Sequence, residues 1–98
     1  SLGFEGGALG FPTSNIQSNS KTGIYWQNYS GGVIVGNDKY GYYESRGKLR
    51  EYWKRNGFES GKMGFPTSNI MTSGKTIYQK YSRGTLYYNT ANGRYTWK

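Results

Sequence analysis

The side chains that most often perform catalysis are missing from this 98-residue chain. It contains no histidine and no cysteine, which removes the commonest general base and the thiol nucleophile. A glycosidase would need two carboxylates facing one another across a sugar. No two of the five acidic residues form such a recognisable pair: they are Glu5, Asp38, Glu44, Glu51 and Glu59. We therefore expect no catalytic site, no metal site and no cofactor.

Aromatic rings are the chemistry that the chain has in excess, with eleven Tyr, four Phe and three Trp. Such rings stack on sugar faces and keep a polar tip for hydrogen bonding. Rings that recur in both halves of the chain are expected to lie in the core: Trp26 with Tyr78, Tyr29 with Tyr81, and Tyr43 with Tyr95. The rings that do not recur, with two cations beside turns, are the candidate glycan contacts: Tyr25, Tyr40, Tyr42, Tyr87, Tyr88, Trp97, Lys39 and Arg94.

The net charge of +8 favours anionic partners such as nucleic acid, acidic wall polymers or anionic membrane surfaces. An extracellular domain that is merely basic explains the charge equally well. No apolar run approaches the roughly 20 residues of a membrane span. The sequence does not begin with a signal peptide, so a secreted origin requires one upstream.

One octapeptide occurs twice: "LGFPTSNI" at Leu9–Ile16 and "MGFPTSNI" at Met63–Ile70. Similarity continues to either side, because 3–16 matches 57–70 and, after a two-residue deletion, 26–37 matches 78–89. A period of this length is typical of repeat architectures. We expect a single domain over 1–98, with unit one at about 3–56 and unit two at about 57–98.

Each unit has the pattern of a β-hairpin with a third strand. Runs of aromatic and β-branched residues predict strands, and the Gly- and Asn-rich stretches between them predict turns. The expected strands are Ile24–Tyr29, Val33–Val35 and Tyr42–Glu44 in unit one, and Thr76–Tyr81, Thr85–Tyr88 and Arg94–Thr96 in unit two.

A helix is expected between the units, over Ser45–Asn56. Ser45 could cap its start and Gly57 could supply a left-handed residue past its end. Leu49, Tyr52 and Trp53 form a narrow apolar stripe. The basic remainder fits either a solvated face or a phosphate contact. The expected fold class is thus α+β, predominantly β: two units of antiparallel β-hairpins with one short helix between them.

The octapeptide itself has the composition of a structural corner. Its glycine permits an unusual φ, the phenylalanine before proline is extended, and Thr-Ser-Asn can satisfy local backbone groups. Ile16 and Ile70 would then anchor the strand that follows. We assign a structural role to its residues: Leu9, Gly10, Phe11, Pro12, Met63, Gly64, Phe65 and Pro66.

These residues resemble the LGFP repeat, a family named after the four-residue motif that stands here as Leu9-Gly10-Phe11-Pro12. The spacing of Gly57, Gly61, Gly64 and Pro66 also agrees, as do the "YQ" segment before a Gly pair and the Trp-containing helix. The resemblance implies a noncatalytic accessory module of secreted Gram-positive wall proteins that holds them to wall polysaccharide. The family's binding residues are not defined well enough to transfer.

One departure from the family pattern predicts unequal units. LGFP units usually carry an aromatic-rich segment after the Gly pair, which unit two keeps as Leu86-Tyr87-Tyr88. Unit one has Ile34-Val35-Gly36 there instead. We therefore expect the two units to bind unequally.

The resemblance implies an extracellular location at the cell wall of a Gram-positive-type bacterium. The expected partner is a wall polysaccharide, arabinogalactan or a peptidoglycan-linked glycan. A structural spacer or protein-interaction module, which could self-associate or pack on neighbouring repeats of a longer chain, is the main alternative. Single-stranded nucleic acid is a less favoured partner, and its binding would weaken steeply with salt.

Overall fold

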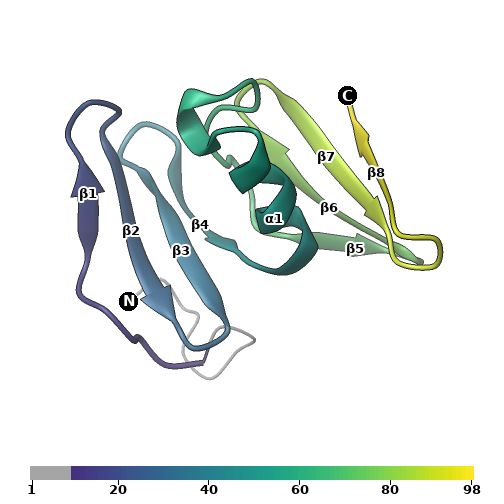
Figure 1. The fold of residues 1–98 in the computed structure, drawn as a ribbon, viewed down its shortest axis with the longest axis horizontal. Helices are drawn as coiled ribbons and strands as arrows, with labels where there is room; N and C mark the ends of the chain where they lie inside the picture. The colour runs from purple at the N-terminus through teal and green to yellow at the C-terminus, as the bar shows by residue number, and fades with distance from the viewer. Residues whose placement is uncertain (1–9) are drawn as a thin grey trace.

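The computed structural model describes residues 10–98, which form two four-stranded antiparallel sheets with a helix between them (Figure 1). The first sheet has the order β1 (Gln17–Asn19), β2 (Ile24–Tyr29), β3 (Gly32–Asn37) and β4 (Gly41–Ser45). The chain then forms α1 (Gly47–Arg55) and the short 3-10 helix η1 (Phe58–Ser60). The second sheet has the order β5 (Met71–Ser73), β6 (Thr76–Tyr81), β7 (Gly84–Asn89) and β8 (Arg94–Trp97).

The predominantly β fold, its six predicted strands and the helix between the units are confirmed. The two three-residue edge strands, β1 and β5, were not predicted. Their sequences, QSN and MTS, are too short and too polar to show a strand pattern. They are strands only because β2 and β6 supply hydrogen-bonding partners.

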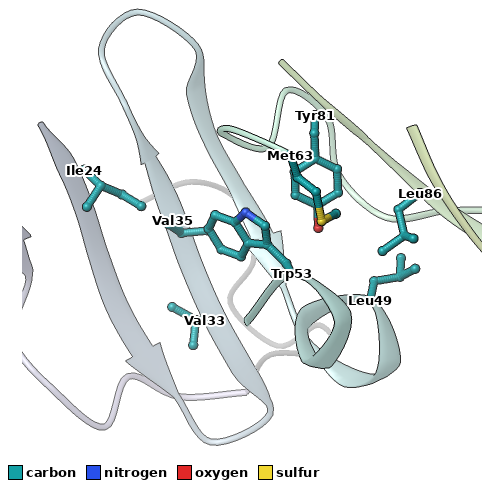
Figure 2. Close-up of a cluster of buried hydrophobic side chains, with 8 residues drawn as sticks. All are labelled: Ile24, Val33, Val35, Leu49, Trp53, Met63, Tyr81 and Leu86. Carbon is teal, nitrogen blue, oxygen red and sulfur yellow. The ribbon is translucent and has the colours of Figure 1, made fainter. Parts of the chain in front are cut away.

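The hydrophobic core surrounds α1 and draws on both sheets (Figure 2). Leu49 and Trp53, two residues of the predicted stripe, are fully buried, and Tyr52 packs against the same cluster. The first sheet contributes Ile24, Val33 and Val35, and the second unit contributes Met63, Tyr81 and Leu86. Burial of this apolar area is the main force that joins the units.

The start of the helix differs from the prediction. Ser45 is the last residue of β4 and is fully buried, with its Oγ accepting a hydrogen bond from Arg50 Nη1 at 3.2 Å. Arg46 occupies the N-cap position and makes no side-chain capping bond. The predicted Ser45 cap is therefore wrong, because that side chain faces the core. Gly57 does adopt the expected left-handed conformation, with φ of 90°.

The two sheets turn opposite faces of the repeat toward α1. In the first sheet, Trp26 and Val35 belong to the face that packs on the core. Their counterparts Tyr78 and Tyr87 pair with one another on the face of the second sheet that points away from Leu86. Alternate residues of a strand point to opposite faces. The expectation that Tyr78 lies in the core with Trp26 is therefore wrong, and Tyr78 is absent from the core cluster.

The third strands are also shifted in register between the units. Asn37 pairs with Gly41, whereas its counterpart Asn89 pairs with Arg94. The turn between β7 and β8 is therefore one residue longer than the turn between β3 and β4. Tyr42, not Tyr43, therefore occupies the position of Tyr95. The sequence comparison that paired Tyr43 with Tyr95 was wrong in register. Among the expected core rings, Trp26, Tyr81 and Tyr95 join the cluster, while Tyr29 and Tyr43 lie outside it.

Both copies of the octapeptide run beside the second strand of their unit. Pro12 bridges to Tyr29 and Pro66 to Tyr81. The serine hydroxyls follow the same pattern, since each accepts a hydrogen bond from a strand N–H at 3.0 Å: Ser14 from Asn28 and Ser68 from Lys80. These matching contacts support the structural role. Leu9 lies outside the described residues.

The two copies differ in burial because only the second lies between the units. Phe65 and Ile70 pack against the core cluster, and Phe65 stacks on Tyr40 of unit one with ring centres 5.3 Å apart. Phe11 and Ile16 are 78% and 68% exposed. Ile70 thus anchors its strand as expected, whereas the same expectation is wrong for Ile16.

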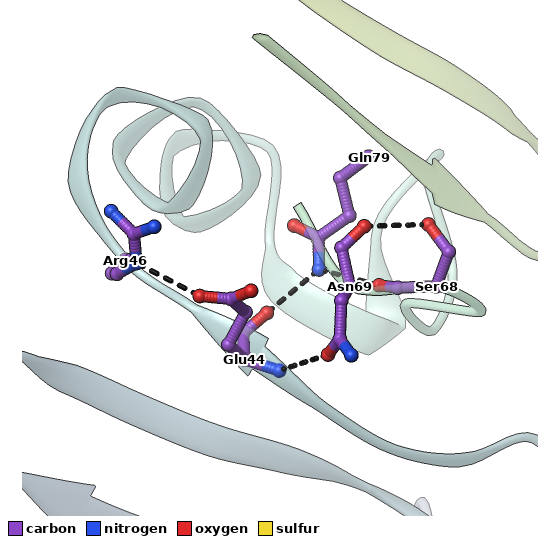
Figure 3. Close-up of polar contacts among 5 residues, drawn as sticks. All are labelled: Glu44, Arg46, Ser68, Asn69 and Gln79. Carbon is purple, nitrogen blue, oxygen red and sulfur yellow. Dashed lines mark hydrogen bonds and ion pairs between the residues drawn. The ribbon is translucent and has the colours of Figure 1, made fainter. Parts of the chain in front are cut away.

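A polar network also joins the units (Figure 3). The buried Gln79 donates from Nε2 to the carbonyl oxygens of Glu44 (2.7 Å) and Ser68 (2.9 Å). Asn69 Oδ1 accepts the Glu44 N–H at 3.2 Å. The octapeptide of unit two and Gln79 therefore hold the outer edge of β4, and this fixes the second sheet against the first.

We expect Gly64→Ala to lower the free energy of unfolding by about 2–3 kcal/mol, because a positive φ costs an L-residue about 1–2 kcal/mol and a hydrogen bond is lost as well. Gly64 has φ of 77°, and an added Cβ would lie 2.0 Å from Ser82 Oγ, which accepts the Phe65 N–H. Gly74→Ala is the matched control, since Gly74 has φ of 59° and open space around it. Urea unfolding would measure both; equal losses would contradict the packing argument.

Candidate functional site

The outward face of the second sheet carries an uncovered pair of aromatic rings. Tyr78 and Tyr87 lie directly opposite one another on β6 and β7, with ring centres 5.5 Å apart and planes inclined by 29°. Ser73 and Thr76 border the rings, and the four residues line an open hollow. We call this surface, defined by Ser73, Thr76, Tyr78 and Tyr87, the tyrosine platform.

The surroundings of the tyrosine platform are hydroxylated and basic. Strand alternation and register place Thr85 and Thr96 on the same face as Tyr87. The Lys98 Nζ lies 5.7 Å from the centre of the Tyr87 ring. Lys80 and Arg94 also belong to this face, and both are exposed. The arrangement offers flat rings for stacking, hydroxyls for hydrogen bonding and positive charge at the rim.

Comparison with known proteins identifies the repeat. The family model described as the LGFP repeat matches residues 9–61, more than half of the chain. The chain belongs to the LGFP repeat family. LGFP repeats are associated with cell-surface proteins. No curated protein matches the chain significantly. Within residues 10–98, neither helix has the length and apolar character needed to cross a bilayer.

Four of the predicted contacts of this LGFP chain lie on outward faces. Tyr87 and Arg94 lie on the face of the tyrosine platform. Tyr25 and Tyr42 lie on the outward face of the first sheet, on either side of Gly36, which pairs with both. Tyr25 is 43% exposed, and the Tyr42 hydroxyl donates to Asp38 at 2.9 Å. The pKa of Tyr42 is raised, chiefly by desolvation and to a smaller extent by the hydrogen bond to Asp38 and the negative charge of Asp38.

Three predicted rings serve packing within the LGFP units instead. Tyr88 and Trp97 face α1 and pack against the core; their ring centres lie 4.9 Å from Tyr95 and 6.1 Å from Tyr81, respectively. Tyr40 stacks on Phe65, and Lys39 Nζ covers the Tyr40 ring at 5.2 Å. As contacts for a glycan, Tyr88, Trp97, Tyr40 and its neighbour Lys39 are therefore not retained.

Sequence reasoning missed Tyr78 as a surface ring. Unit one has a ring, Trp26, at the equivalent position, and a ring present in both units was taken as a core residue. Only Trp26 lies on the face of its sheet that is turned toward α1. Strand alternation around Leu86 could have shown that Tyr87 points away from Tyr88. No comparable signal marked Tyr78, because the neighbouring Gln79 is polar and yet fully buried.

Proposed function

We propose that this LGFP chain is a noncatalytic cell-wall module that binds a wall polysaccharide, an arabinogalactan- or peptidoglycan-linked glycan, on its tyrosine platform. It would act outside the cell, at the wall of a Gram-positive-type bacterium. The observation that carries the proposal is the stacked Tyr78–Tyr87 pair on a sheet face that α1 does not cover. Paired rings of this kind offer apolar area to sugar C–H groups and hydroxyls to sugar oxygens.

The composition of this face supports a ligand surface over a packing surface. The corresponding face of the first sheet has Ile24 and Val33, both buried in the core cluster. By strand register, Thr76 and Thr85 occupy these positions in the second sheet. A face that packs on a helix gains from aliphatic side chains, since apolar burial drives the contact. Hydroxyls beside two rings suit a polyhydroxylated ligand instead.

The salt dependence of binding to the platform separates a neutral glycan from nucleic acid. Lys80, Arg94 and Lys98 lie around the rings, and they suit either an acidic polymer or a neutral one. Nucleic-acid binding would be dominated by these cations and would weaken steeply with salt. Stacking of a neutral glycan depends on the rings and should persist at high salt.

The proposal is tested by retention of the full chain on purified Gram-positive walls at low and high salt. We expect Tyr87→Ala to weaken binding about tenfold, because loss of one stacking contact of about 1–1.5 kcal/mol corresponds to that factor. Tyr87→Phe should bind nearly normally, since the ring remains. Walls stripped of their covalent polysaccharide should no longer retain the chain.

Tyr25→Ala is the matched control, because it removes an exposed ring of the first sheet. If Tyr25→Ala weakens binding and Tyr87→Ala does not, the glycan surface lies on the first sheet and the platform assignment is wrong. No retention of the parent chain under any condition would favour the spacer or protein-interaction alternative. Retention that disappears at high salt would contradict ring stacking.

A further inference from the structure

A cavity of about 270 Å³ lies between the first sheet and the α1–η1 segment, away from the tyrosine platform. Three aromatic side chains line it: Trp26 from β2, Trp53 from α1 and Phe58 from η1. Trp53 and Phe58 meet edge to face, with ring centres 5.1 Å apart. The polar side chains of the lining are Asn19, Arg50 and Glu59. Asn19 is exposed, so the cavity communicates with solvent.

Two opposite charges line this cavity without neutralising each other. The Arg50 guanidinium lies 5.2 Å from the Phe58 ring centre and donates to Ser45 Oγ, a neutral partner. Glu59 Oε2 accepts a 2.6 Å hydrogen bond from Thr22 Oγ1, which is also neutral. The ion pairs among residues 10–98 are Arg46–Glu44 and Lys48–Glu51, so neither charge of the cavity belongs to one.

Partly buried charges without an ionic partner are costly to maintain, and they are typical of sites that complete their hydrogen bonding with a ligand. The Arg50 side chain is partly buried, and this burial lowers the pKa of its guanidinium. Arg50 donates only, whereas the Glu59 carboxylate accepts only. A ligand that fills the cavity should therefore both accept and donate hydrogen bonds.

We propose that the cavity binds a single neutral sugar residue, the end residue of a glycan chain, with its ring against Trp26, the partly exposed tryptophan of the lining. Sugar oxygens would accept from Arg50 and Asn19, and a sugar hydroxyl would donate to Glu59. A volume of 270 Å³ is just below the roughly 300–1,000 Å³ of most small-molecule sites, so it suits one ring and not a chain. The Glu59 carboxylate disfavours an anionic ring.

This inference rests on the proposed function for its ligand class, but it concerns a different site. The tyrosine platform is an open surface that suits the side of a glycan chain, whereas the cavity is a recess between β2, α1 and η1 that suits a chain end. The two sites do not share a residue.

The test uses the full chain labelled with ¹⁵N, because the indole N–H signals of Trp26 and Trp53 report on the cavity. The probes are methyl arabinofuranoside, methyl galactofuranoside, methyl glucopyranoside and glucuronate, titrated through the millimolar range. We expect at least one neutral glycoside to shift both indole signals saturably. Glu59→Gln should weaken this binding at least tenfold, because the variant keeps the side-chain shape and its Thr22 partner but loses the charged acceptor. Lys54→Ala, which changes an exposed residue of α1 outside the lining of the cavity, should leave the binding unchanged.

Several results would overturn the inference. They are the absence of a saturable shift with every neutral glycoside, shifts that Glu59→Gln leaves unaltered, or tighter binding of glucuronate than of the neutral sugars. Wall retention that depends on Tyr87 but comes without indole shifts would refute the cavity and leave the proposed function standing. Indole shifts without wall retention would refute the proposed function and leave the cavity as a sugar site.

Discussion

Trp53→Ala is expected to lower the free energy of unfolding by about 4–5 kcal/mol, a large part of the roughly 5–15 kcal/mol that stabilises a typical domain. Trp53 is fully buried between the sheets, and its ring contacts two rings of unit two, Phe58 at 5.1 Å and Tyr81 at 5.8 Å. Its Nε1 also donates to the Gly64 carbonyl at 2.9 Å, and the variant leaves that oxygen without its partner. Urea unfolding followed by circular dichroism measures the loss.

The control for Trp53→Ala is Lys54→Ala. Lys54 follows Trp53 on α1 and is exposed, so its replacement should change stability by no more than about 0.5 kcal/mol. A loss below about 1.5 kcal/mol for Trp53→Ala would mean that neighbouring side chains fill the space left by the indole. The packing of the two sheets would then not depend on this side chain.

Gln79→Leu is expected to destabilise the protein by about 3 kcal/mol or more, because each buried polar group left without a partner costs about 1–3 kcal/mol. Leucine fits the space but cannot donate to the carbonyls of Glu44 and Ser68. It also cannot accept the 3.0 Å hydrogen bond from the Tyr81 hydroxyl. Three polar groups at the junction of the units would lose a partner: the buried Tyr81 hydroxyl and the two partly buried carbonyls.

The repeat provides a matched control in Gln27→Leu. Gln27 donates to the Ser14 carbonyl at 3.0 Å and accepts from the Tyr29 hydroxyl at 3.3 Å, but it is only partly buried. Water can replace a lost partner at such a position, so we expect a loss of about 1 kcal/mol or less. Equal losses for Gln27→Leu and Gln79→Leu would refute the view that Gln79 stabilises the junction.

Local patterns were sufficient to predict the six longer strands, the helix and the left-handed Gly57. They failed where a long-range contact decided the outcome. Ser45 has the residue type of a helix cap, but the pairing of β4 with β3 places it in the core. The one-residue difference in the second turn became visible only through the pairs Asn37–Gly41 and Asn89–Arg94.

The candidate sites followed the same division. Tyr87 was predicted because its segment is aromatic in one unit alone. Tyr78 was missed because a recurring ring was taken to keep one environment in both units. The cavity could not be predicted, because Asn19, Trp26, Arg50 and Glu59 are separated along the chain and converge only when α1 packs on the first sheet.

The opposite use of sheet faces has an evolutionary consequence. The position shared by Trp26 and Tyr78 holds a ring in both units, yet in one it is selected for stability and in the other, by our proposal, for binding. The replacement of Ile24 by Thr76 and of Val33 by Thr85 between the units accompanies the change from a core-packing face to a hydrated one. A consensus averaged over LGFP units would therefore mix two selective pressures, and positions should be compared by the face they present.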